Sequence, residues 1–191
     1  LNPKFYFNLS LLAENYYDND NFNISREILE KFSSKDEIYF WYKIKKIAQI
    51  ISEEENDDKS LKYIEDNISY LKQKSPKILF DLANIYKNFE NYKIAIDYYT
   101  QVLNQIDKNS NMYADVLYRR GGTYERLKNY SKADKDLLMS LNIRPDHAYT
   151  LNYLSYSWLE RNIKIEQAMK MLMRAYELRE NDPCLLYTSD A

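Results

Sequence analysis

One pattern returns along the chain at a spacing of roughly 34 residues, and it limits the folds that the chain can adopt. Each copy contains two short runs of apolar residues at helical spacing, with a small residue at the same place in each run. The clearest copy contains Leu79, Leu82, Ala83, Tyr86 and Ala95, and the next contains Leu117, Gly121, Tyr124, Ala133 and Leu137. A repeat of this length is typical of helical hairpins that stack and share their apolar faces. The sequence therefore predicts an array of hairpins and not a closed globule.

Composition agrees with helices and excludes several classes of partner. The 191 residues include only 2 Gly and 4 Pro, which favours helices joined by tight turns over a sheet-rich fold. The net charge is −2, and basic and acidic residues are interspersed, so there is no concentrated basic face for nucleic acid. No apolar run approaches the ~18 residues of a membrane span. We therefore predict no nucleic-acid partner and no insertion of this segment into a membrane.

Residues that carry catalysis or bind metals are scarce. One cysteine, Cys184, and one histidine, His147, leave no internal disulfide and no His-rich metal site. No nucleophile elbow, paired catalytic carboxylates or zinc signature is present. The acids of residues 53–58 lack the ordered spacing and the glycine of a calcium loop, and we interpret them as a solvated turn. We predict no enzymatic activity, no cofactor and no metal.

The repeated pattern resembles the tetratricopeptide repeat. That family places small residues where the two helices of a hairpin cross. The resemblance implies an all-α fold, an α-solenoid that winds as a right-handed superhelix of about five hairpins. By this comparison Ala13 and Ser25 are the small residues of the first hairpin, and Gly121 packs at the crossing of the fourth. The second hairpin departs from the family, because Lys45 replaces its first small residue and an acidic insertion at 53–58 lengthens its turn.

The resemblance divides the chain into seven segments. Residues 1–5 are expected to end an upstream repeat, five repeats occupy 6–37, 38–75, 76–113, 114–147 and 148–183, and residues 184–191 break the pattern. We interpret the last segment as a non-native tail, because it resembles translated sequencing-adapter DNA; a genuine end of the chain is the alternative. Residues 124–126, 151–157 and 175–179 resemble a bacterial subgroup of long arrays, often exported to the periplasm or outer membrane. We therefore expect an internal fragment of such an array, and a cytoplasmic location remains the alternative.

The resemblance also implies a concave groove, lined by the first helices of the hairpins, in which ligands bind. Tyr42, Phe80 and Tyr118 are expected to share one position in successive repeats and to form an aromatic row. Such a row suits an extended peptide or an exposed helix. The other candidate ligand-binding residues are Tyr39, Lys46, Lys77, Asn84, Lys87, Tyr149, Asn152 and Tyr156. Because the chain contains 20 Tyr, the alternative is that these rings only cover adjacent helices.

Two further features of the groove follow from the resemblance. Gly122 is expected to leave the floor of the groove open. The version of this fold that binds the C-terminal tails of chaperones holds a carboxylate with Lys, Asn and Arg. Of the corresponding residues here, only Arg119 matches, so we do not expect that ligand; the residues are Tyr42, Lys46, Asp81, Asp115 and Arg119.

We therefore predict a non-catalytic scaffold for protein–protein interaction, which binds a peptide or a protein segment in its groove. One alternative is the recognition arm of a larger enzyme, such as a glycosyltransferase or protease, and another is a structural spacer without a groove ligand. The last helix presents Met169, Leu172, Met173 and Tyr176 with no polar capping helix after it. Self-association through this end of the array is therefore also expected.

Overall fold

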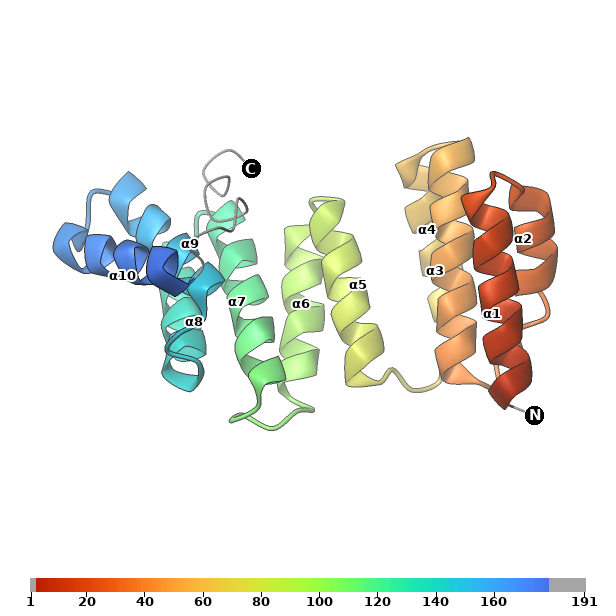
Figure 1. Ribbon diagram of the computed structural model, residues 1–191, viewed down its shortest axis with the longest axis horizontal. Coiled ribbons are helices and arrows are strands. Elements are labelled where there is room, and N and C mark those ends of the chain that lie inside the picture. Colours follow the sequence, from red (N-terminus) through yellow and green to blue (C-terminus); the bar gives the residue numbers. More distant parts are fainter. Residues whose placement is uncertain (1–2, 179–191) are drawn as a thin grey trace. The chain divides into compact units, whose positions relative to one another are not determined.

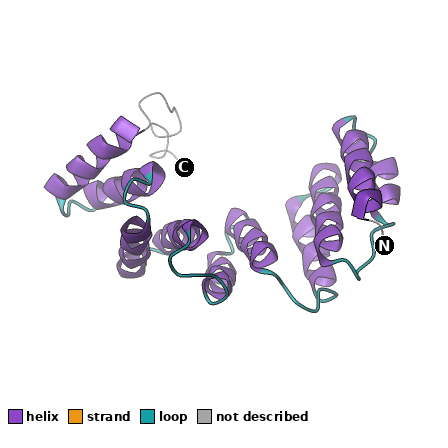
Figure 2. Cartoon of the chain, turned by 60° about the horizontal axis from the view of Figure 1, so that its bottom comes forward, coloured by secondary structure: helices purple, strands orange, loops and turns teal. Residues whose placement is uncertain are grey.

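The computed structural model describes residues 3–178, and every regular element in that range is an α-helix (Figure 1, Figure 2). The ten helices are α1 Pro3–Asp18, α2 Phe22–Leu29, α3 Glu37–Glu54, α4 Asp57–Ile68, α5 Pro76–Asn88, α6 Tyr92–Leu103, α7 Asn111–Arg126, α8 Tyr130–Ile143, α9 Ala148–Glu160 and α10 Ile165–Leu178. Each odd-numbered helix packs against the helix that follows it, which gives five hairpins. The predicted all-α class is confirmed.

The chain divides into two compact units, residues 1–74 and 75–191. The first unit contains α1 to α4, and α2 contacts α3 within it. The second contains α5 to α10, in which α6 contacts α7 and α8 contacts α9. Large side chains that are fully buried hold each unit together, among them Leu29 and Ile50 in the first and Leu82, Leu117 and Trp158 in the second. Each hairpin thus shares its apolar face with a neighbour, as an array requires.

Short polar side chains begin several helices. Asp36, Asn56 and Ser110 each accept a hydrogen bond from a backbone N–H three residues later, at 3.2, 3.0 and 3.1 Å. Such a bond satisfies a donor that has no partner within the helix. Pro76 begins α5, where the N–H that proline lacks would have no helical partner. The helix boundaries therefore follow from local sequence.

The turn of the second hairpin contains no acidic insertion, and that prediction is wrong. α3 continues to Glu54 and α4 begins at Asp57, so only Glu55 and Asn56 lie between them. Asp57 and Asp58 stabilise the first turn of α4, because the amino end of a helix favours negative charge. The acids belong to helix ends and not to a longer loop.

Small residues mark the crossing of the two helices in each hairpin of the first unit. Ser25 donates a hydrogen bond of 2.8 Å to the carbonyl oxygen of Ala13. Ser60 makes the same bond, at 2.7 Å, to the carbonyl oxygen of Ala48. Ala48 is therefore the small residue at the second crossing, and the prediction that Lys45 stands there is wrong.

The crossings of the second unit are equally tight. Ala83 and Ala95 are fully buried on α5 and α6. A Cβ atom added to Gly121 on α7 would lie 2.9 Å from Cγ of Leu137 and 3.3 Å from the carbonyl oxygen of Ala133. No side chain fits there unless Leu137 or its helix moves, which agrees with the packing role predicted for Gly121.

Two predicted segments concern the ends of the chain. α1 begins at Pro3, so it already includes part of residues 1–5, which we assigned to an upstream repeat. The boundaries of the segments remain predictions. The segment 184–191, with Cys184, lies outside the described residues.

Candidate ligand-binding faces

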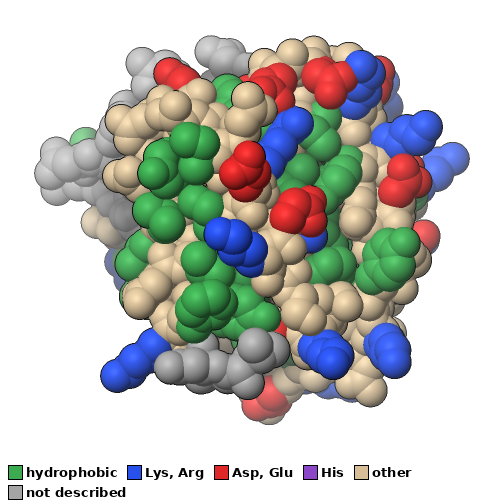
Figure 3. All heavy atoms as spheres, turned by 90° about the vertical axis from the view of Figure 1, so that its right-hand side faces the viewer, with side chains coloured by type: hydrophobic (Ala, Val, Ile, Leu, Met, Phe, Trp, Pro, Cys, Tyr) green, Lys and Arg blue, Asp and Glu red, His purple; other side chains and the backbone are tan. Residues whose placement is uncertain are grey.

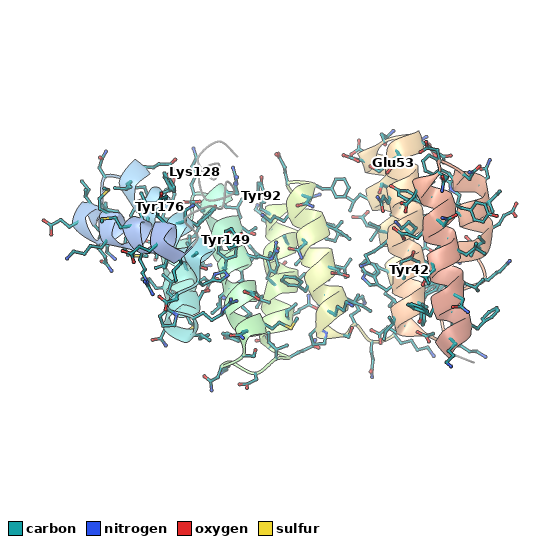
Figure 4. All side chains as sticks on the ribbon, viewed as in Figure 1. Tyr42, Glu53, Tyr92, Lys128, Tyr149 and Tyr176 are labelled. Atoms are coloured by element: carbon teal, nitrogen blue, oxygen red, sulfur yellow. The ribbon has the colours of Figure 1, made fainter. Side chains whose placement is uncertain are left out.

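Tyr42 lies on α3 of the first unit, where its hydroxyl is bonded to α1 (Figure 4). The hydroxyl donates to Oε2 of Glu14 at 2.7 Å and lies 3.2 Å from the carbonyl oxygen of Ser10. The ring packs edge-on against Phe32, with centroids 6.0 Å apart. Burial, and then the hydrogen bond to Glu14, raises the pKa of Tyr42. Both ends of this side chain therefore have partners within the first unit.

Lys46 is also held by α1. Its side chain forms an ion pair of 2.8 Å with Oε1 of Glu14, and the ammonium lies 4.0 Å from the centroid of the Tyr17 ring. Oε1 of Gln49 accepts a further hydrogen bond from it at 3.2 Å. Burial raises the pKa of Glu14, but the hydrogen bonds from Lys46 and Tyr42 outweigh it and the net shift is downward. The residue is only 8% exposed, so little of it is left for a ligand.

Tyr39, the third predicted residue of the first unit, packs within the core. Its ring stacks on Phe32 with a centroid distance of 5.7 Å, and it lies 5.3 Å from the ring of Tyr6. The contacts of Tyr39, Tyr42 and Lys46 thus fit the alternative interpretation, in which these side chains cover an adjacent helix.

The outer surface of α1 and α2 is more apolar than the face of α3 that carries Tyr39, Tyr42 and Lys46. Figure 3 looks onto the end of the first unit and shows hydrophobic side chains among charged ones. The exposed large hydrophobic residues of these two helices are Phe5, Phe7, Leu11, Leu12 and Ile24. These five side chains have no polar group that could bind a ligand by hydrogen bonds.

In the second unit, α5 and α7 bring Phe80 and Asn84 together with Arg119. The guanidinium carbon of Arg119 lies 5.4 Å from the centroid of the Phe80 ring, and that ring also meets Tyr99 at 6.0 Å. Oδ1 of Asn84 accepts hydrogen bonds from the Tyr99 hydroxyl at 2.7 Å and from Nη1 of Arg119 at 3.4 Å. Because both bonds end on the oxygen, the amide nitrogen of Asn84 is the group left to donate to a ligand.

The two lysines of α5 lie at opposite ends of the helix. Lys77 is exposed in the first turn, and Lys87 is half-buried in the last. Burial lowers the pKa of Lys87, and the positive charges of Arg119 and Arg126 lower it further. This end of the α5–α7 face is therefore positive.

Tyr118 continues the face on α7, between two aromatic side chains. Its ring meets Tyr153 of α9 edge-on at 6.0 Å and His147 at 5.7 Å. Burial, and then a hydrogen bond to Glu125, raises the pKa of Tyr153. A Cβ atom on Gly122 would lie 3.3 Å from the Tyr153 hydroxyl. Gly122 is therefore buried beneath Tyr153, and the prediction that it leaves an open floor is wrong.

Three predicted residues belong to α9. Tyr149 is labelled in Figure 4 and is half-buried. Its ring meets His147 edge-on at 6.0 Å. Tyr156 is also half-buried, on the same helix. Asn152 is 1% exposed, so it is not available to a ligand in this conformation.

One type of contact recurs on these first helices, and the sequence prediction missed most of it. The residue two positions before the small residue reaches back to the first helix of the preceding hairpin. There it meets the residue that directly follows that helix's own small residue. The pairs are Lys46 with Glu14, Arg119 with Asn84, and Tyr153 with Gly122. Glu14, Arg119 and Tyr153 were not among the predicted site residues, although this regular spacing could have indicated them.

A cavity of about 370 Å³ lies between α7 and α8 and is lined in part by an ion pair. The guanidinium of Arg120 donates to both carboxylate oxygens of Asp136, at 2.7 and 2.9 Å, and to the hydroxyl of Thr100 at 2.9 Å. Burial alone would lower the pKa of Arg120, but the hydrogen bonds that it donates to Asp136, together with the negative charge of that carboxylate, outweigh burial and raise the pKa. These bonds join α6, α7 and α8, which indicates a structural role.

Residues 3–178 contain neither a metal-binding cluster nor a membrane-spanning helix. No group of three or more His, Cys, Asp or Glu there could hold a metal ion. No helix in this part of the chain is long and apolar enough to cross a membrane.

Residues 76–109 and 114–147 each match the family model of the tetratricopeptide repeat. These ranges contain the α5–α6 and α7–α8 hairpins, in which the small-residue crossings are clearest. The chain is a tetratricopeptide repeat protein. The resemblance read from the sequence is thus confirmed for the family.

A relative and several solved structures agree. The TPR repeat-containing protein PA4667 of Pseudomonas aeruginosa is 29% identical over 72 residues, which are 38% of this chain. The match spans 12% of the length of that relative. A MamA double mutant has a TM-score of 0.68 at 12% identity, over 94% of this chain and 96% of that one. YrrB has a TM-score of 0.66 at 12% identity, over 96% and 91%. These structures confirm the solenoid fold of this tetratricopeptide repeat protein.

Proposed function

We propose that this tetratricopeptide repeat protein is a non-catalytic interaction scaffold that binds an extended protein segment along α5, α7 and α9. The fold supports a role in protein–protein interaction. We choose the face on α5, α7 and α9 because its polar groups are less engaged within the protein than those on α3. On α3, the predicted groups of Tyr42 and Lys46 are bonded to Glu14. On α5, the amide nitrogen of Asn84 remains as a donor, and Lys87 lies near the positive charges of Arg119 and Arg126.

The aromatic side chains of this face suit such a ligand. Phe80 and Tyr118 are half-buried, so each has a supported ring with one part still accessible. Rigid rings of this kind supply contact area with little loss of side-chain entropy. The amide of Asn84 lies between them in sequence and would donate to a backbone carbonyl of the segment. Lys77, Tyr149 and Tyr156 would extend the face at its two ends.

One structural relative supports the proposal in a limited way. YrrB is described as a TPR protein with an unusual peptide-binding site. At 12% identity this property belongs to YrrB, and it shows only that the fold is compatible with peptide binding.

The proposal is tested by selecting ligands from a displayed peptide library with the whole chain as bait. Selected peptides are then titrated against Phe80→Ala, Asn84→Ala and the control Met139→Ala, which removes an exposed apolar side chain from α8. We expect the first two to weaken binding at least about tenfold, since each removes a central contact. Met139→Ala should leave affinity unchanged. A selection without binders, or binders equally affected by the control, would refute the proposal.

A further inference from the structure

We infer that the segment bound by the second unit carries an acidic side chain, Asp or Glu, that is held between Lys87 of α5 and Arg119 of α7. The inference rests on the proposed function and names the chemistry of its ligand.

The positions of the cations follow from side-chain contacts between α5 and α7. Arg119 contacts Asn84 at 3.4 Å, and Lys87 follows Asn84 by one helical turn on the same face. Arg126 follows Arg119 by two turns on α7, which brings a third positive charge toward the same end. Arg119 is exposed and Lys87 half-exposed, so an approaching carboxylate can reach both.

Lys87 and Arg119 have no acidic partner within residues 3–178. Among the described residues, Lys87 forms neither an ion pair nor a hydrogen bond. Within the same part of the chain, Arg119 donates to the neutral oxygen of Asn84 and stacks over Phe80.

Such an arrangement is unfavourable in the free protein. Removing an ammonium from water without a partner disfavours its charged form, and nearby charges of the same sign add to this effect. Both causes appear in the lowered pKa of Lys87. A carboxylate between Lys87 and Arg119 would give the ammonium a hydrogen-bond partner and would offset the repulsion between the two cations. Hydrogen bonds between ionised groups are stronger than those between neutral groups.

The residues around Lys87 and Arg119 also indicate which ligand residues lie next to the acidic side chain. The Phe80 ring lies beneath the Arg119 guanidinium, so an apolar side chain of the ligand would rest on Phe80 beside the carboxylate. The preferred segment is therefore an apolar residue close to Asp or Glu, with a backbone carbonyl facing Asn84. The site requires no chain terminus, which separates it from recognition of a C-terminal carboxylate.

The test uses fluorescent peptides with both ends blocked. Three peptides share a Leu-X-X-Leu centre in which the two variable residues are Glu-Asp, Gln-Asn or Lys-Lys. Binding to the whole chain is measured by anisotropy at low and high salt. We expect the Glu-Asp peptide to bind at least about tenfold more tightly than the Gln-Asn peptide, and salt to reduce the difference.

Substitutions test whether Lys87 and Arg119 cause the preference for the Glu-Asp peptide. Lys87→Gln and Arg119→Gln should each weaken the Glu-Asp peptide about tenfold and leave the Gln-Asn peptide nearly unchanged. Lys93→Gln, the control, removes an exposed lysine from α6 and should change neither. Equal binding of all three peptides, with sensitivity to Phe80→Ala, would overturn the acidic specificity and leave the scaffold proposal standing. Failure of all three peptides, together with a failed library selection, would overturn both.

Thermal unfolding separates a ligand-binding role of Lys87 from a role in stabilising the fold. If Lys87 serves the ligand, Lys87→Gln relieves repulsion in the free protein and its Tm should stay equal or rise. A lower Tm, with unchanged peptide affinity, would show that Lys87 supports the fold and overturn the inference.

Discussion

The hydroxyl of Ser60 donates a hydrogen bond of 2.7 Å to the carbonyl oxygen of Ala48. Ser25 and Ala13 make the same bond in the preceding hairpin, so Ala48 and Ala13 are equivalent. The residues that stand three positions before the small residue in α1, α3, α5 and α7 are then Ser10, Lys45, Phe80 and Tyr118. Tyr42 does not share the position of Phe80, and the aromatic row begins only in the second unit.

Enlarging the residue at this crossing should destabilise the first unit. Ala48→Leu inserts three carbon atoms between α3 and α4, and overpacking of this kind costs about 1–3 kcal/mol. Lys45→Leu, three residues earlier, removes a cation that lies 5.6 Å from the Trp41 ring, and loss of that cation–π contact costs about 1 kcal/mol or less. Chemical denaturation followed by circular dichroism compares the two. Equal stability of the two variants would contradict the assignment of the crossing to Ala48.

The adjacent glycines of α7 should respond to alanine with opposite signs. Alanine favours a helix over glycine by about 1 kcal/mol. At Gly121 the new Cβ lies 2.9 Å from the buried Leu137 side chain, so we expect a net loss of about 1–2 kcal/mol. At Gly122 it meets the end of the Tyr153 side chain at 3.3 Å, and a small shift of that ring leaves a net gain of up to about 1 kcal/mol. Melting curves of both variants decide the matter, and a gain at Gly121 would disprove the tight crossing.

The fold could be predicted where small and apolar residues repeat without interruption. Ala83 and Ala95 are separated by twelve positions, as are Gly121 and Ala133, and the apolar residues around them fix a single register. The family model matches these same two hairpins. In α3 the alignment with the repeat pattern was ambiguous, because Ile44, Ile47 and Ile50 fit its apolar positions in more than one register. The signal that resolves it is Ser60, which follows Ala48 by twelve positions.

The candidate site could be predicted less well, because its contacts depend on how neighbouring helices pack. Sequence spacing placed Phe80, Asn84 and Tyr118 on first helices, and the structure agrees. It did not show that Tyr153 would cover Gly122, or that Glu14 would bind Lys46. Those contacts join residues of different hairpins, and the periodicity within one helix carries no information on them.

Glycine should stabilise the turns between α5 and α6 and between α7 and α8. Glu90 and Lys128 have φ of 60° and 56°, a left-handed conformation that is unfavourable for residues with a Cβ atom. Figure 4 labels Lys128 at its turn. Glu90→Gly and Lys128→Gly should each gain about 0.5–1 kcal/mol after the entropy of glycine in the unfolded chain is subtracted. Glu55→Gly is the matched control, since its φ is −128° and glycine there should destabilise. Denaturant midpoints test the set; a loss at Glu90 or Lys128 would exclude strain at these turns.

The outer face of α10 should promote self-association of the chain. Met169, Met173 and Tyr176 are 46%, 62% and 54% exposed on this helix, whereas Leu172 is half-buried. Exposed apolar side chains grouped on one face favour contact with a second apolar surface. We expect sedimentation velocity to show a mass that rises with protein concentration, and Met169→Lys/Met173→Lys to abolish the rise. Met139→Lys on α8 is the control, and association that persists in the double variant would place the contact elsewhere.

Stability should fall at high pH because tyrosines are held neutral by the fold. Burial raises the pKa of Tyr99 from 10.0 to about 12, and its hydroxyl donates to Asn84. A folded-state pKa above the unfolded one gives stability that is complete below pH 10 and is lost as pH rises toward 12, because only the unfolded chain releases the proton in that interval. Tyr99→Phe should lose about 1 kcal/mol at neutral pH with the hydrogen bond, yet its stability should decline less steeply above pH 10. Tyrosinate absorbance and circular dichroism, recorded together during the titration, test this; parallel declines for the wild type and Tyr99→Phe would show that Tyr99 ionises freely in the folded protein.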